Sequence, residues 1–155
     1  MAVNIAVYFA QLGRDVVLVD ADPTDSNLHT HFGCKAARVE LDLAGDPVAR
    51  MREALVPTSV PGLSLLPAAH DALASGPSLR AGRKARWLGA LRGLAVDYVV
   101  IDAGPGHGDG AVDVMLAADV PIAVAVPEPP AVEATYRFLR AMFRRRLRRA
   151  LCATK

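Results

Sequence analysis

Two short runs of branched aliphatic side chains, each ended by an aspartate, constrain the fold most strongly. They occupy residues 15–20, where the letters are DVVLVD, and residues 97–102, where they are DYVVID. A run that is apolar at consecutive positions predicts a strand buried on both faces, which is typical of a parallel sheet. We expect a third buried strand at 120–126 and a short one at 63–66.

Helical segments separate these expected strands. Gly13 ends the first one, and Asp46 followed by Pro47 is a typical helix start. The expected helices are 2–12, 46–55, 79–94, 111–118 and 132–150. Alternating helices and strands predict an α/β fold with a mostly parallel sheet and helices on both faces, in three layers. The length of 155 residues suits one domain, and a 52% apolar composition excludes a disordered tail.

Carboxylates and glycines follow the expected strands. Asp20 and Asp22 follow the first long strand, and Asp102 opens a glycine-rich stretch after the second. Parallel strands deliver such residues to one edge of a sheet, where ligands bind. Gathered carboxylates favour a hard cation such as Mg²⁺ bound with phosphate, and glycines let backbone amides approach an anion. A single acid here is better interpreted as a helix cap or turn former, but the combined pattern favours a ligand site.

These motifs resemble the ParA/MinD group of deviant Walker-A ATPases. Residues 17–30 (VLVDADPTDSNLHT) resemble the strand and switch I of that family, and 99–106 (VVIDAGPG) resemble its Walker B strand and switch II. Residues 127–130 (PEPP) with 133–139 resemble the segment after the next strand, most closely in the MinD and flagellar-number branch. The helix at 2–13 resembles the one that follows the phosphate loop. The resemblance covers nearly the whole chain, in order.

The resemblance implies a set of site roles. Asp102 and Asp20 would serve the magnesium ion, and Asp22 would be the catalytic residue that orients the attacking water. The residues implied to contact the nucleotide are Gly104, Gly106, Pro127 and Glu128. The complete family form would bind Mg²⁺ and ATP, and ATP would bring two copies together as a dimer. Hydrolysis of ATP would make it a positioning or partitioning switch, acting with a protein regulator or cargo. The mechanism would be phosphoryl transfer to water.

The family's phosphate loop does not occur in these residues. No G-x-x-x-x-G-K-[ST] run is present, and none of Lys35, Lys84 and Lys155 follows a glycine loop. Because that loop cradles the phosphates, we expect very weak nucleotide binding and no useful hydrolysis. We expect a single partial domain over 1–155, lacking the family's first strand and its C-terminal part, with exposed strand edges. The alternative is a non-catalytic interaction module that keeps only the fold.

The last expected helix is strongly basic. Lys and Arg number 18 against 16 Asp and Glu, yet residues 137–149 hold seven arginines and no acid. Its apolar positions recur every three or four residues, at Tyr136, Leu139, Phe143, Leu147 and Leu151. We favour a surface helix with this apolar stripe packed on the sheet and its arginines in water. The alternative is an anionic partner, either DNA or a membrane surface, bound through Arg137, Arg140, Arg144, Arg145, Arg146, Arg148 and Arg149.

Cysteine and histidine positions are less specific. Cys34 and Cys152 are far apart and form no C-x-x-C, which favours a reducing cytoplasm over a disulfide framework. His29 and His31 have a spacing known among zinc ligands, with Asp22 nearby in sequence. No fixed zinc pattern is completed by these or by His70 and His107, so loop histidines on a polar edge are the preferred interpretation.

Overall fold

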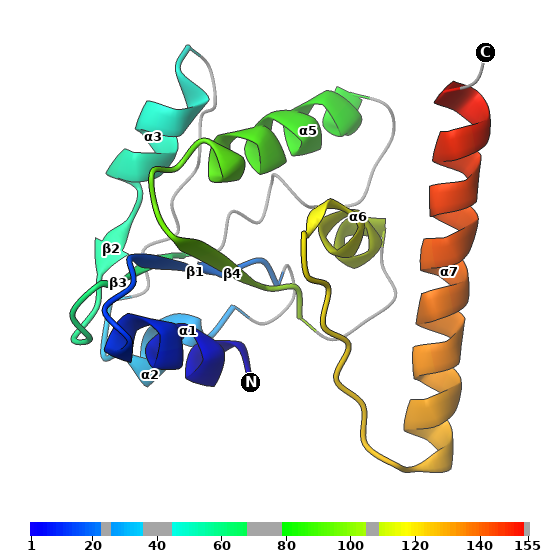
Figure 1. Ribbon diagram of the computed structural model, residues 1–155, viewed down its shortest axis with the longest axis horizontal. Helices are drawn as coiled ribbons and strands as arrows, with labels where there is room; N and C mark the ends of the chain where they lie inside the picture. Colours follow the sequence, from blue (N-terminus) through cyan, green and yellow to red (C-terminus); the bar gives the residue numbers. More distant parts are fainter. Residues whose placement is uncertain (23–25, 36–44, 68–78, 105–108, 154–155) are drawn as a thin grey trace. The chain divides into compact units, whose positions relative to one another are not determined.

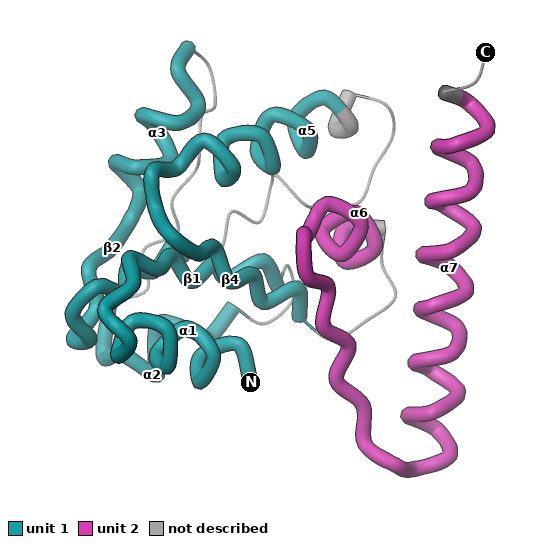
Figure 2. Tube along the Cα trace, in the orientation of Figure 1, with its two compact units in different colours: residues 1–104 teal, residues 105–155 magenta. Residues whose placement is uncertain are grey.

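The structure is a computed structural model that describes residues 1–22, 26–35, 45–67, 79–104 and 109–153. Its chain falls into two compact units, residues 1–104 and 105–155, which are described separately below (Figure 2). Within the described ranges, none of the helices has both the length and the apolar character needed to cross a bilayer.

The first unit is built around a four-stranded sheet in the order β2-β3-β1-β4. The strands are β1 (Val16–Asp20), β2 (Val56–Pro57), β3 (Leu63–Leu66) and β4 (Tyr98–Asp102). β1 pairs in parallel with both β3 and β4, and β2 pairs antiparallel with β3. Every residue of β1 is buried, as the aliphatic run predicts for a central parallel strand. The expected mostly parallel sheet is therefore confirmed.

Helices cover both faces of this sheet (Figure 1). On one face lie α1 (Ala2–Gln11) and α2 (Leu28–His31), and on the other lie α3 (Pro47–Glu53) and α5 (Leu79–Arg92). Side chains of β1 alternate between the faces, so Val16 and Leu18 join the core cluster with α1. The opposite side of the sheet has its own fully buried side chains, among them Val17, Val19, Met51 and Trp87. The three-layer arrangement follows from this two-sided burial.

Local signals set the helix ends as the sequence predicts. Gly13 follows α1 with a φ of 75°, and its amide donates to the carbonyl of Ala10. The Asp46 side chain accepts hydrogen bonds from the amides of Val48 at 3.0 Å and Ala49 at 3.2 Å. That aspartate is therefore the N-cap of α3, with Pro47 in the first turn.

The strand expected at 120–126 is wrong. In the described part of the chain this segment pairs with no strand and is exposed throughout. Val120 is 75% exposed and Val124 is 62% exposed. An apolar run becomes a strand only when a neighbouring strand accepts its backbone hydrogen bonds, and none of the described strands does so here.

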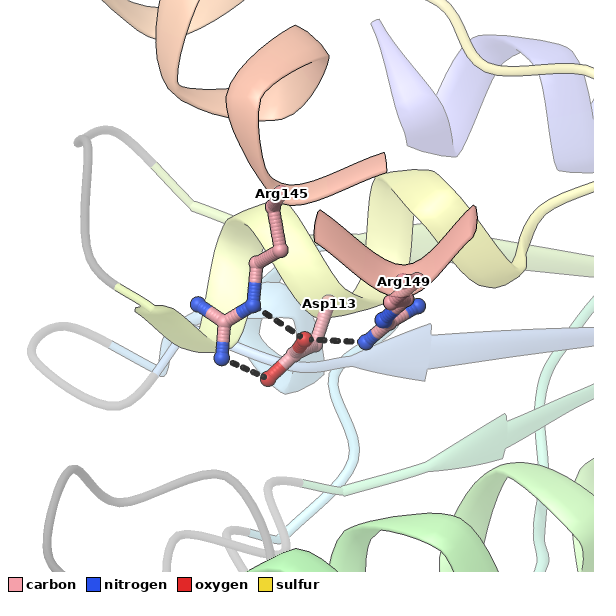
Figure 3. A network of polar contacts seen from close by, with 3 residues as sticks. All are labelled: Asp113, Arg145 and Arg149. Carbon is pink, nitrogen blue, oxygen red and sulfur yellow. Dashed lines mark hydrogen bonds and ion pairs between the residues drawn. The ribbon is translucent and has the colours of Figure 1, made fainter. Parts of the chain in front are cut away.

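In the second unit, α6 (Asp109–Ala117) is joined to α7 (Pro129–Ala153) through one buried acid. The carboxylate of Asp113 accepts a hydrogen bond from Nη2 of Arg149 at 2.7 Å (Figure 3). It also lies 3.3 Å from Nε of Arg145, one helical turn earlier. Arginines 145 and 149 therefore lie on the face of α7 that meets α6.

Within the second unit, the apolar stripe of α7 is exposed, from 47% at Leu139 to 68% at Phe143. The ion pairs of Asp113 turn Arg145 and Arg149 toward α6, so the stripe at Tyr136, Leu139, Phe143, Leu147 and Leu151 lies on another side of the helix. The expected packing of this stripe on the sheet would join the two units, and it stays a prediction.

Candidate functional site

The carboxyl ends of β1 and β4 bring two of the predicted acids together. Asp20 and Asp102 are register partners across the parallel pair. The amide of Ala21 donates to the carbonyl of Asp102 at 2.8 Å, which extends the ladder one step beyond the strands. The segments that follow β1 and β4 therefore leave the sheet side by side. Asp22 lies in the segment after β1, two residues beyond Asp20.

The carboxylate of Asp20 organises the loop after β1. It is 2% exposed, and its Oδ2 accepts hydrogen bonds from Oγ of Ser26 at 2.7 Å and the amide of Leu28 at 3.1 Å. Its Oδ1 accepts from the amide of Asp22 at 3.4 Å. Buried carboxylates with several donors act as local anchors. Asp20 thus ties β1 to the start of α2, and sequence reasoning missed the part played by Ser26.

Asp22 is buried against Gly104 from the other strand end. Gly104 has a φ of 68°, a conformation that side-chain-bearing residues seldom adopt. A Cβ added to it would lie 2.5 Å from Cγ of Asp22 and 2.6 Å from its Oδ2. Glycine is therefore required at 104 for the Asp22 carboxylate to occupy its position. The glycine after Asp102 and the acid after Asp20 belong to one packed arrangement.

Asp102 offers the carboxylate oxygen best suited to a cation. Its Oδ1 accepts a hydrogen bond from the amide of Gly104 at 3.1 Å. Among the described residues no donor reaches its Oδ2, and no lysine or arginine forms an ion pair with Asp20 or Asp102. A hard cation such as Mg²⁺ takes carboxylate oxygens and waters, so Asp102 fits this role. The Asp20 oxygens, by contrast, are engaged in the loop.

The other residues predicted to contact the nucleotide lie outside the described part of the first unit. Gly106 lies outside the described residues, as do His70 and His107. Pro127 and Glu128 belong to the second unit, where the amide of Glu128 donates to the carbonyl of Val126 at 2.9 Å. Among the described histidines, cysteines and acids, no three are grouped closely enough to hold a metal ion. The described part of the chain therefore gives no support to a zinc site at His29 and His31.

Comparison with known proteins agrees with this arrangement. The family model of ParA, described as NUBPL iron-transfer P-loop NTPase, matches residues 1–146. The chain belongs to the ParA family. It is 40% identical over 105 residues to the chromosome-partitioning ATPase Soj of Thermus thermophilus, covering 67% of this chain and 39% of Soj. It is 32% identical over 129 residues to the iron-sulfur cluster carrier protein of Synechocystis, covering 81% of this chain and 35% of the carrier.

Solved structures support the same fold. The septum site-determining protein MinD of Pyrococcus horikoshii, complexed with Mg-ADP, superposes with a TM-score of 0.62 at 21% identity. The match covers 86% of this chain and 54% of MinD. This ParA-family chain therefore has the P-loop NTPase fold, and it spans between a third and three fifths of the length of the relatives named here.

Proposed function

We propose that these residues carry the magnesium aspartate and the switch aspartate of a ParA/MinD-type ATPase. The observation that supports this most is the pairing of Asp20 with Asp102 at one sheet edge, with Asp22 packed on Gly104. Together they present carboxylates from two strand ends, and among the described residues no lysine or arginine forms an ion pair with Asp20 or Asp102. Such a group is stable beside a divalent cation and an anion that the cation binds.

Each acid has a distinct part in the proposed mechanism. Asp102 would hold Mg²⁺, because its Oδ1 alone is engaged by the Gly104 amide, and the bound ion would supply charge neutralisation for phosphoryl transfer. Asp22 orients the attacking water, and its buried position against Gly104 fixes its direction. Asp20 supports the ion indirectly, by anchoring the loop through Ser26 and Leu28. We further assign nucleotide contacts to Gly104, Gly106, Pro127 and Glu128.

ATP hydrolysis also needs a phosphate-binding loop, which these 155 residues do not contain. We therefore expect the chain by itself to bind Mg-ATP too weakly for isothermal titration at micromolar concentrations. A micromolar dissociation constant would show that the loop is not required. The complete activity is proposed for a polypeptide that includes such a loop and forms an ATP-dependent dimer in the cytoplasm, where both free cysteines stay reduced.

The longest product of the gene that encodes these residues gives the direct test of catalysis. In that protein, Asp22→Ala should abolish ATP turnover and hold an ATP-bound dimer, measured by phosphate release and size-exclusion chromatography. Asp15→Ala is a matched control, since it makes the same change at an exposed position just before β1. Unchanged turnover in Asp22→Ala would remove the role proposed for that residue.

A non-catalytic interaction module is the second candidate, favoured by the missing glycine-lysine loop. It predicts a stable fold with no Mg-ATP binding in any product of the gene. For the complete protein we propose a positioning or partitioning switch. Chromosome partitioning itself is the process named for Soj.

A further inference from the structure

The hydroxyl of Ser26 holds one oxygen of the buried Asp20 carboxylate. Ser26 Oγ donates to Oδ2 of Asp20 at 2.7 Å, and Asp20 is 2% exposed. A hydrogen bond to a carboxylate is shorter and stronger than one between neutral groups. Because a serine hydroxyl has a single proton, Ser26 cannot donate to another group, such as a phosphate, while it donates to Asp20. The side chain is therefore committed to Asp20.

The same oxygen of Asp20 takes the place of a local cap on α2. The N-cap residue of α2 is Asn27, whose side chain makes no capping hydrogen bond. The amide of Leu28, the first residue of the helix, donates instead to Oδ2 of Asp20 at 3.1 Å. An amide at a helix start is usually satisfied by a side chain close by in sequence, whereas this acceptor lies eight residues earlier, at the end of β1. Ser26 and Leu28 are thus fastened to β1 through one shared oxygen.

The other oxygen of Asp20 reaches Asp22. The amide of Asp22 donates to Oδ1 at 3.4 Å, and the amide of Ala21 donates to the carbonyl of Asp102 at 2.8 Å. The backbone that leads into Asp22 is therefore held at two consecutive residues. The terminal torsion of an aspartate is broad, so the donors around a carboxylate set its direction. Its two oxygens turn together, so a donor at Oδ2 also fixes Oδ1, and Ser26 acts on Asp22 through this carboxylate.

We propose that Ser26 is a positioning residue for Asp22. The catalytic part of this inference rests on the proposed function, in which Asp22 orients the attacking water. The hydrogen bonds that join Ser26 to Asp20 and Asp20 to Asp22 do not depend on that function, and all three residues belong to the first unit. Displacing a catalytic group by about 1 Å can lower a rate by about a hundredfold. Loss of the Ser26 hydroxyl should therefore lower turnover more than it weakens substrate binding.

Amide hydrogen exchange tests the positioning in this chain without nucleotide. In Ser26→Ala, the amides of Leu28 and Asp22 should exchange about tenfold faster, because the carboxylate that accepts both has lost its hydroxyl donor. In Ser26→Thr, which keeps a hydroxyl, their exchange should stay within about twofold of the original. Exchange at Val17, inside β1, should not change in either variant. Unchanged exchange at Leu28 and Asp22 in Ser26→Ala would overturn the proposal.

A matched control makes the same substitution elsewhere in the sheet. Ser64 lies in β3 as the register partner of Val17, and it is half-buried, as Ser26 is. Ser64→Ala should leave exchange at Leu28 and Asp22 as it is in the original protein. If Ser64→Ala accelerates exchange there as much as Ser26→Ala does, the effect is a general loss of stability and the assignment to Ser26 is wrong.

Steady-state kinetics of the longest product of the gene test the part played in catalysis. Ser26→Ala should lower kcat by about tenfold with the KM for Mg-ATP within about twofold, and Ser26→Thr should restore most of kcat. An equal loss of kcat in both variants, or a raised KM with kcat unchanged, would overturn the role given to the hydroxyl. If the original product has no turnover, the proposed function fails, and the exchange measurement alone decides whether Ser26 positions Asp22.

Discussion

Gly104 leaves no room for a side chain beside Asp22. Alanine at 104 would incur the strain of a positive φ, about 1–2 kcal/mol, and would also push on the Asp22 carboxylate. Gly13→Ala carries a similar strain with open space around it. We predict that Gly104→Ala lowers the free energy of unfolding by at least about 1 kcal/mol more than Gly13→Ala, measured by urea denaturation.

A double-mutant cycle isolates the steric part of that effect. Asp22→Ala removes the two atoms nearest the added Cβ, namely Cγ and Oδ2. The cost of Gly104→Ala should therefore fall by about 0.5 kcal/mol or more in the Asp22→Ala background. Equal costs in the two backgrounds would show that these residues are not coupled, and that Asp22 is held by other contacts.

At the level of elements, the sequence predicts what burial and local capping decide. β1, β3 and β4 follow from their apolar runs, and α3 follows from Asp46 and Pro47. β2 could not be predicted, because Val56–Pro57 is a strand only through its pairing with β3. The sequence predicts that Asp20 and Asp102 meet, because parallel strands end at the same edge of a sheet. It does not predict the hydrogen bond from Ser26 to Asp20, because that bond depends on the path of the chain between them. The contact of Asp113 with Arg145 and Arg149 could not be predicted, because it leaves no sequence signal.

The pairing of α6 with α7 depends on Asp113. Its side chain is 9% exposed, while those of Arg145 and Arg149 are 34% and 56% exposed, so water partly screens the pairs. We predict that Asp113→Ala weakens the attachment of α7 by about 1–2 kcal/mol, with amide exchange in α7 faster by about tenfold. Exchange in β1 should not change. The surface variant Glu133→Gln should have an effect below about 0.5 kcal/mol, and equal effects would refute a special role for Asp113.

At the level of the whole molecule, two features leave backbone or apolar groups without a partner in the described structure. β4 is an edge strand of the sheet, and residues 120–126 are extended apolar chain in the other unit. Residues 122–126 contain only isoleucine, valine and alanine, and exposed uncharged segments of this kind associate with one another in solution. We therefore predict that the purified chain aggregates on warming, and that Val124→Lys slows this aggregation severalfold, measured by light scattering.

The thermal midpoint of the first unit should be unaffected by Val124→Lys, because Val124 is 62% exposed and contributes little to a core. A general rise in net charge also increases solubility, so the same change must be made elsewhere. Ser59→Lys adds a positive charge at an exposed position between β2 and β3. If Ser59→Lys slows aggregation as much as Val124→Lys, the cause is net charge. If only Val124→Lys does so, the unpaired segment at 120–126 nucleates the association.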